Sequence, residues 1–138
     1  MLDIENYVVN TIQNAFNDAG ITVLVDSVFQ PSPKEFPCVM VQEVDNIPMD
    51  YTQDLEELYR RVLYQIDVIV AETPIKQNCV KLMEIADNAM HNMKFSRVEY
   101  DLSTSEDRTM AWGTMQYRAI VGRPKKVGND QVYQMYRQ

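Results

Sequence analysis

The sequence predicts a single two-layer α+β domain, in which two helices pack on one face of a mainly antiparallel or mixed β-sheet. The chain of 138 residues has the usual length of one domain, and 46% of it is hydrophobic, which is enough for a buried core. Residues 3–19 and 75–93 place apolar side chains at helical spacing. Five other stretches are rich in β-branched residues or alternate between apolar and polar residues, as strands do.

The first helix is expected over residues 3–19. Asp3 stands at the expected N-cap, and Gly20 stands where a glycine commonly ends a helix. The apolar stripe of this helix consists of Ile4, Tyr7, Val8, Ile12, Ala15, Phe16 and Ala19. A strand is expected next, over residues 21–29, and the three prolines of residues 30–37 then predict a loop.

Two strands follow this loop. The strand at 38–44 is expected to lie inside the sheet, with both faces covered over its first half, because Gln42 and Glu43 are its only polar residues. The strand at 60–71 alternates most clearly, and its apolar side chains that point one way are Val62, Tyr64, Ile66, Val68 and Val70. The acidic residues 46–58 between these strands are expected to form a long connecting loop.

The second helix is expected to begin at Pro74 and to cover residues 75–93. Its apolar stripe consists of Ile75, Cys79, Leu82, Met83, Ala86, Ala89, Met90 and Met93. The strand at 96–102 also alternates, with Val98, Tyr100 and Leu102 on the face opposite Arg97, Glu99 and Asp101. After a polar turn, the last strand is expected over residues 109–121.

The strand pattern ends at Gly122 and Pro124, so we expect an α+β domain over residues 1–122 and a basic C-terminal arm over residues 123–138. The formal net charge of the chain is −7. The arm has four basic residues and one acidic residue, a net +3, which leaves −10 for residues 1–122. An acidic body does not suit tight binding of nucleic acid, which needs a basic face that neutralises phosphates.

The apolar runs of the chain are too short to cross a bilayer; the run at residues 21–25 is an example. The first residues lack the basic segment and the small-residue cleavage site of a signal peptide. We therefore expect a soluble protein that is made in a cytosol and has no contact with a membrane.

The residues that most often carry out chemistry do not form a catalytic pattern. Cys38 and Cys79 match neither a disulfide framework nor a zinc site, and both are expected to be small buried residues. His91 is expected to face solvent near the end of the second helix, about 18 Å along the helix axis from Cys79. Only the tertiary fold can bring His91 close to Cys38.

Other sequence motifs give the same result. The serines lack the contexts of known nucleophiles, and the four glycines are too scattered for a phosphate-binding loop. The acidic residues have no calcium-loop spacing. The sequence therefore predicts no catalytic residue, no cofactor and no metal site.

Two segments remain as candidate functional surfaces. Loops as long as the expected 46–58 connection often have a function. Its candidate interface or lumen residues are Asp45, Asp50, Tyr51, Asp54, Glu56 and Glu57. The C-terminal arm is the candidate contact with a neighbouring subunit, because amphipathic aromatic residues favour interfaces. The candidate residues of the arm are Val132, Tyr133, Met135 and Tyr136.

The order of strands and helices resembles one protein family. The stretches that carry the resemblance are FPCVMVQEVDN with Val39, Val41 and Val44, then YRRVLYQIDVIV, IADNAMHNMKF, RVEYDL and RTMAWGTMQYRAIV. Together they resemble the tail terminator proteins of long-tailed bacteriophages, which are also called tail-completion or tail-to-head joining proteins. The resemblance covers about residues 1–122.

This resemblance implies a structural virion protein and not an enzyme. The implied assembly is a homo-oligomeric ring, a hexamer, in the tail or neck of the virion, built in the host cytoplasm. The ring would cap the tail tube protein, stop its elongation and join the tail to the head connector or stopper protein, while DNA passes through the lumen without specific binding. An acidic body suits such a lumen because it does not retain phosphates.

Two alternatives remain open at this point. The first is another ring of the neck or tail, such as a head-completion protein or a tail tube protein, because these share related folds. The second belongs to another class: a small cytosolic α+β enzyme or ligand-binding domain, with a pocket around Cys38, His91 or the acidic residues.

Overall fold

The structure is a computed structural model that describes residues 4–27, 37–51, 57–127 and 130–136. The elements in chain order are α1 (Glu5–Asp18), β1 (Leu24–Asp26), β2 (Cys38–Tyr51), β3 (Glu57–Val70), α2 (Ile75–Asn92), β4 (Ser96–Thr104), β5 (Ala111–Val127) and β6 (Asp130–Tyr136). The order agrees with the sequence expectation through β5, and β6 adds one strand.

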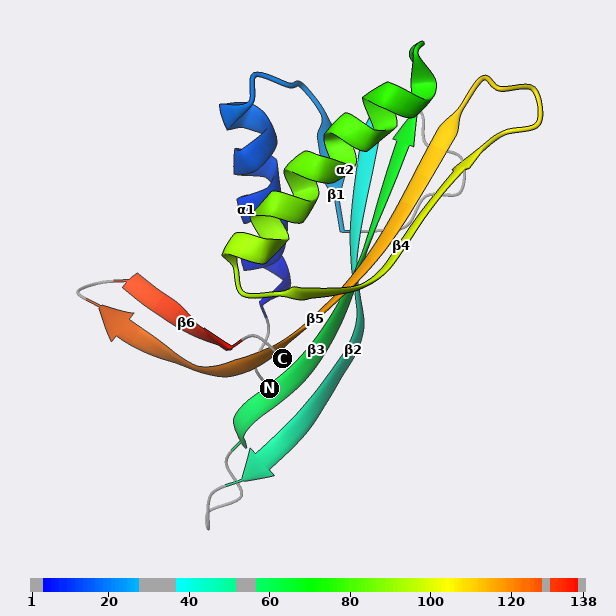
Figure 1. Cartoon of the computed structure of the whole chain (residues 1–138). Coiled ribbons are helices and arrows are strands. Elements are labelled where there is room, and N and C mark those ends of the chain that lie inside the picture. The colour runs from blue at the N-terminus through cyan, green and yellow to red at the C-terminus, as the bar shows by residue number, and fades with distance from the viewer. Residues whose placement is uncertain (1–3, 28–36, 52–56, 128–129, 137–138) are drawn as a thin grey trace.

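The six strands form one open sheet. Five of them follow the order β1-β2-β3-β5-β4, and the sixth, β6, also pairs with β5. Among the described strands, only β1 and β2 run parallel, and all other pairs are antiparallel. Both helices lie on the same side of this sheet (Figure 1). The predicted fold class, a two-layer α+β domain with two helices on a mixed, mostly antiparallel sheet, is confirmed.

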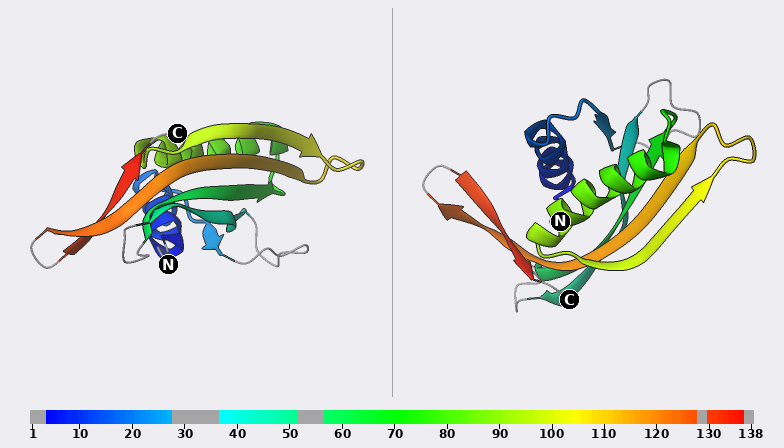
Figure 2. Two further views of the ribbon diagram at one scale, coloured as in Figure 1. Left: turned by 90° about the horizontal axis from the view of Figure 1, so that it is seen from below. Right: turned by 45° about the horizontal axis from the view of Figure 1, so that its top comes forward.

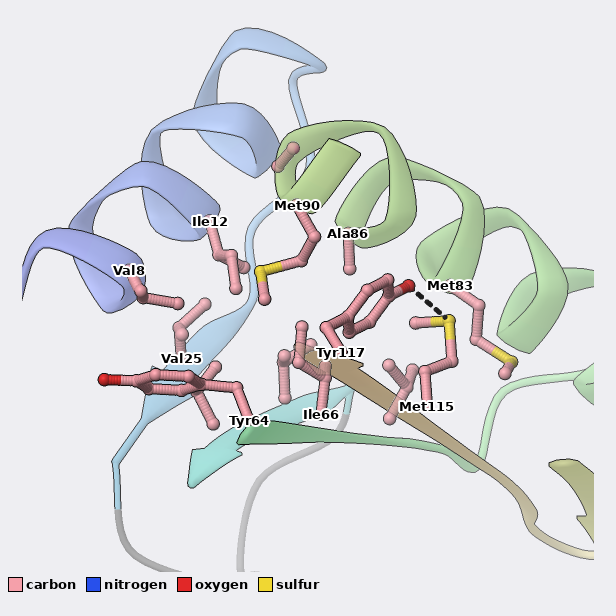
Figure 3. Close-up of a cluster of buried hydrophobic side chains, with 14 of the residues drawn as sticks. Val8, Ile12, Val25, Tyr64, Ile66, Met83, Ala86, Met90, Met115 and Tyr117 are labelled. Carbon is pink, nitrogen blue, oxygen red and sulfur yellow. Dashed lines mark hydrogen bonds between the residues drawn. The ribbon is translucent and has the colours of Figure 1, made fainter. Parts of the chain in front are cut away.

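The main core lies between the helices and the sheet. From the sheet, β3 contributes all five apolar residues that the alternation assigned to one face, and β5 contributes Met115, Tyr117, Ala119 and Val121. The predicted stripes of both helices pack against them, except for Ala19 at the end of α1, which is exposed (Figure 3). Gly113 lets α2 approach β5 closely, because a Cβ atom there would lie 2.2 Å from the Met83 sulfur.

Helix ends follow the sequence signals only in part. Gly20 has a φ of +73°, and its N–H donates to the carbonyl of Asn17 at 3.0 Å, so the predicted glycine at the end of α1 is confirmed. The predicted N-cap, Asp3, lies outside the described residues, and Ile4 holds the N-cap position of the described helix. The stretch 21–29 was expected to be a strand, but its strand β1 is only three residues long.

The expected loop over residues 46–58 is wrong in extent. β2 continues to Tyr51 and β3 already begins at Glu57. Pro48 does not break the strand because a β-bulge lies between Pro48 and Asp50. In addition, no described strand pairs with the outer side of β2 here, and proline is tolerated at such an edge. The acidic stretch is thus mostly a β-hairpin that extends beyond the helices (Figure 1).

The expected end of the last strand at residue 121 is also wrong. β5 continues to Val127, and β6 folds back to pair with it from Ile120 onward. The register between β5 and β6 shifts between Gly122 and Lys125, so Pro124 lies in a bulge, where no ladder hydrogen bond is required of its nitrogen. The resulting β5–β6 hairpin extends away from the two helices (Figure 2).

Strand β4 follows the predicted alternation only from Glu99 onward, and it is not half-buried. Arg97 was expected opposite Tyr100 but lies with its guanidinium over the Tyr100 ring, so its predicted face is wrong. Val98 and Tyr100 are 44% and 46% exposed. The strand is at the edge of the sheet, and a bulge between Arg97 and Glu99 interrupts its pairing with β5. Alternation predicted the strand correctly, whereas the burial of its apolar residues depends on α2, which covers β4 incompletely.

Candidate interaction surface

The two cysteines and the histidine do not form a site. Cys79 lies on the buried face of α2 with its sulfur 3.8 Å from the Val68 carbonyl oxygen, and burial raises the pKa of its thiol to about 11. A thiol with such a pKa stays protonated and is a poor nucleophile at neutral pH. The expectation that both cysteines are buried is confirmed.

The alternative that His91 meets Cys38 through the fold is wrong. Cys38 pairs with Ile69 on the sheet face opposite the helices, and it packs there with Met40. His91 is exposed in the last turn of α2, on the other side of the sheet, as the sequence predicted. Within the ranges that the structure describes, no group of three His, Cys, Asp or Glu residues can hold a metal ion.

The sheet face opposite the helices, here called the open face, is organised in rows across the strands. The register of the strands places the following residues side by side on it: Cys38, Ile69, Trp112 and Ser103; Met40, Asp67, Thr114 and Asp101; Gln42, Gln65, Gln116 and Glu99; Asp45, Leu63, Arg118 and Ser96; Ile47, Arg61, Ile120 and Tyr136. The first two rows form its buried end and the last two its exposed end.

A carboxylate is the centre of the buried end. Asp67 is only 1% exposed, and one of its oxygens accepts hydrogen bonds from Trp112 Nε1 at 3.1 Å and Thr114 Oγ1 at 2.7 Å. The other oxygen accepts a bond from Gln65 Nε2 at 3.0 Å, and Gln65 in turn accepts a bond from Gln116 Nε2 at 3.0 Å. This network joins β3 to β5 and satisfies the buried charge, so Asp67 has a structural explanation.

The exposed end combines apolar side chains with two cations. Arg61 and Arg118 are exposed on neighbouring strands, and a pocket of about 290 Å³ lies next to them. This pocket is lined by Asp45, Arg61, Val62, Leu63, Val98, Gln116 and Arg118. Val44, in the β2 bulge, is 50% exposed, and Ile47 is also exposed. Arginine beside exposed apolar side chains is the composition typical of protein interfaces.

Two tyrosines extend this end toward the β5–β6 hairpin. The rings of Tyr59 and Tyr136 meet edge to face, with centroids 5.9 Å apart and planes at 72°. Gly122 pairs with Tyr59 on the strand between them, so no side chain separates the two rings. The tyrosine pair therefore joins β3 to β6 across β5, while Met135, on the opposite face of β6, packs against the main core.

A polar network on the helix side supports the same part of the sheet. Arg60 is buried and donates through its guanidinium to the side-chain oxygen of Asn46 and, at 2.6 Å, to the carbonyl of Asn46. Asn46 Nδ2 donates to Glu43 at 2.8 Å, and the Tyr64 hydroxyl donates to the same oxygen at 3.2 Å. These bonds hold β2 against β3 around the bulge, so side chains on the helix side of the sheet fix the shape of the exposed end.

A second groove lies between α2 and β4. It is lined by Val80, Met83, Glu84, Asp87, Arg97 and Tyr100. The Arg97 guanidinium lies 4.9 Å from the centroid of the Tyr100 ring and 3.4 Å from Asp87, and Asp87 also accepts a 2.6 Å bond from Tyr117. These charges are satisfied within the groove, which indicates a structural role.

The predicted interface residues are scattered by the fold. Asp45 is on the open face beside Leu63, while Asp50 and Tyr51 belong to β2 and Glu57 to β3. Asp54 and Glu56 lie outside the described residues. Of the arm, Val132 and Tyr133 lie in β6, Met135 faces the core, and Tyr136 is exposed on the open face.

The sequence reasoning missed Tyr59, Arg61 and Arg118 as surface residues. A signal for Arg61 was present, because the alternation of strand 60–71 already placed it on the face opposite Val62. No comparable signal existed for the row that joins Arg61 to Ile47 and Ile120, because a row depends on strand register, which bulges change.

Comparisons with protein-family models and with curated proteins found no match for this chain. In the parts of the chain that the structure describes, no helix is long and apolar enough to span a membrane.

Proposed function

We propose that this protein is a structural subunit of a phage virion, a tail terminator that assembles into a hexameric ring in the tail or neck region. The ring caps the tail tube, stops its elongation and joins the tail to the head connector or stopper protein. The proposal rests on the sequence resemblance over residues 1–122 and on a fold that is compatible with it. It assigns no catalytic step and no cofactor to the chain.

One observation supports an assembling protein most strongly: the exposed end of the open face. Its rows place Ile47, Leu63 and Ile120 beside Arg61 and Arg118, and no described element covers them. Ile47 is exposed and Leu63 and Ile120 are half-buried, so apolar side chains and arginines share this surface, a composition typical of protein interfaces. In the ring, this end is buried against a neighbouring subunit, and arginine contributes strongly to such contacts.

The charge of the chain supports the passage of DNA through the lumen. A formal charge of −7 per subunit would give a hexamer an acidic surface on average. DNA binds basic surfaces through its phosphates, so an acidic lumen lets it move without being retained. We propose no sequence-specific or tight contact with DNA.

Mass measurement and electron microscopy of the purified chain test the proposal. We expect a particle of about six times 16.1 kDa with a central hole, and capping of purified tail tubes at one end. A tail tube protein would instead stack into long cylinders, and a small enzyme or ligand-binding domain would leave tail tubes uncapped. A chain that is monomeric at high concentration and leaves tubes uncapped would contradict the proposal.

A charge reversal on the open face locates the contact. We expect Arg118→Glu to weaken ring formation at least tenfold, because Arg118 lies at the centre of the exposed end. The matched control is Arg108→Glu, which makes the same change in the exposed turn between β4 and β5. If both variants assemble like the wild-type chain, the open face is not the subunit contact.

A further inference from the structure

Two strands of the sheet, β2 and β5, each carry charge of a single sign, whereas β3 and β4 carry both signs. β2 contains the acidic residues Glu43, Asp45 and Asp50 and no basic residue. β5 contains the basic residues Arg118, Arg123, Lys125 and Lys126 and no acidic residue. The acidic part of β2 belongs to the β2–β3 hairpin, whereas most basic residues of β5 belong to the β5–β6 hairpin.

These two hairpins occupy opposite sides of the sheet. On its outer side, β2 pairs with β1 only over Cys38–Met40, so among the described strands its later part has no neighbour there. On the other side of β3, β6 pairs along the outer side of β5 from Ile120 to Val127. The two hairpins point away from the helices in different directions (Figure 1).

The positions of the two hairpins limit the symmetry by which the acidic edge of one subunit can meet the basic hairpin of another. In a two-fold dimer, both copies of the contact form between the same two subunits. The acidic edge and the basic hairpin, on opposite sides of one sheet, would then both have to reach the same partner at once. Opposite sides of one sheet instead favour a head-to-tail contact, which repeats from subunit to subunit and closes into a ring. The occupant that fits the acidic edge is therefore a second copy of this chain.

We propose that the acidic edge of β2, from Asp45 to Tyr51, docks against the basic β5–β6 hairpin of the next subunit in the ring. This inference rests on the proposed ring and names the two surfaces that build it. Among the strands that the structure describes, none pairs with the outer side of this part of β2, so its backbone groups are available there, and the sequence of β5 places Lys125 and Lys126 in the hairpin that would dock on it. Charge complementarity sets the register and suppresses contacts between like edges.

Two charge-reversal variants test the pairing. Asp45→Lys/Asp50→Lys makes the β2 edge basic, and Lys125→Glu/Lys126→Glu makes the hairpin acidic. Each variant then has two surfaces of the same sign, so we expect each alone to assemble at least tenfold more weakly than wild type in sedimentation at low salt. Rings of the wild-type chain are expected to loosen as salt rises, because exposed charges are screened.

Mixing the two variants gives the decisive measurement. In an equimolar mixture, the basic edge of one variant meets the acidic hairpin of the other, and the unchanged surfaces also match. An alternating ring with an even number of subunits therefore forms again. The matched control is Glu99→Lys/Asp101→Lys, which reverses two exposed acids on the edge strand β4 and is expected to assemble like wild type.

Every other outcome of these measurements contradicts either the proposed function or the proposed pairing of the two surfaces. If the wild-type chain never forms rings, alone or on tube ends, both the proposed function and this pairing are wrong. If rings form but the charge reversals do not weaken them, or the mixture does not restore them, only the pairing is wrong. Thermal melting of each variant identifies loss of folding, and a variant that melts far below wild type is replaced by Asp50→Lys or Lys126→Glu alone.

Discussion

The two ends of the open face are built from the same strands and still have different physical roles. At the buried end, Asp67 and Ile69 are enclosed and the polar groups bond to one another. At the exposed end, Ile47 and Arg61 continue the same strands but lie at the surface. The difference shows that strand register determines which residues are neighbours across the sheet. The burial of those residues then determines whether they stabilise the fold or are available for contacts at the surface.

The largest expected effect compares two isoleucines on this face. Ile69→Ala removes a fully buried side chain and leaves a cavity, so we expect a loss of about 3 kcal/mol of unfolding free energy. Ile47→Ala at the exposed end is expected to cost less than about 0.5 kcal/mol in the monomer. Urea unfolding of both variants measures the difference. Equal losses would contradict the division of the open face into two ends.

A second comparison uses two aspartates. Asp67→Ala leaves the donors of Trp112, Thr114 and Gln65 without their buried acceptor, so we expect a loss of about 2 kcal/mol. Asp45→Ala removes an exposed carboxylate and is expected to change monomer stability by less than about 0.5 kcal/mol. If Asp67→Ala unfolds at the wild-type urea concentration, the network is not what stabilises the buried end.

The loss of stability at alkaline pH tests the burial of two titratable groups between the helices and the sheet. Burial raises the pKa of the Cys79 thiol to about 11, and burial together with Asp87 raises the pKa of Tyr117 above its usual range. The folded chain therefore holds these protons more tightly than the unfolded chain. Because the unfolded state releases them first, stability is expected to fall as the pH rises above about 9.

The measurement is urea unfolding at a series of pH values between 8 and about 11. Cys79→Ala and Tyr117→Phe are each expected to flatten the fall in stability, because each removes one group whose proton is held by the fold. His91→Ala is the control, because it removes an exposed side chain from the last turn of α2 and leaves both buried groups in place. An unchanged slope in the two variants would show that other groups govern the alkaline limit.

Periodicity predicted most of the fold because packing follows it here. The alternation of β3 and the stripe of α2 both placed their apolar residues on the faces that form the core. The predicted ends of two strands are wrong. β2 was expected to end at residue 44 and β5 at residue 121, but bulges next to Pro48 and Pro124 let both strands continue, which a pattern of single residues does not reveal.

The sequence alone predicted less of the candidate interaction surface than of the fold. Arg61, Arg118 and Ile120 are far apart in the chain or separated by residues of the other face, and only the pairing of β3 with β5 makes them neighbours. The sequence did indicate that 45–57 and 123–138 differ in charge. That both charges belong to hairpins on opposite sides of one sheet follows from the topology alone.

The smallest expected effect concerns the tyrosine pair that joins β3 to β6. Tyr59 and Tyr136 meet edge to face at the exposed end, where solvent reaches both rings, so their coupling is expected to be about 0.5–1 kcal/mol. A double-mutant cycle with Tyr59→Ala, Tyr136→Ala and the double variant measures this coupling free energy. The matched control is the buried pair Tyr64 and Phe95, which meets at a similar 5.6 Å under the helices. A coupling near zero for Tyr59 and Tyr136 would mean that β6 is held by its backbone ladder and by Met135, and not by this contact.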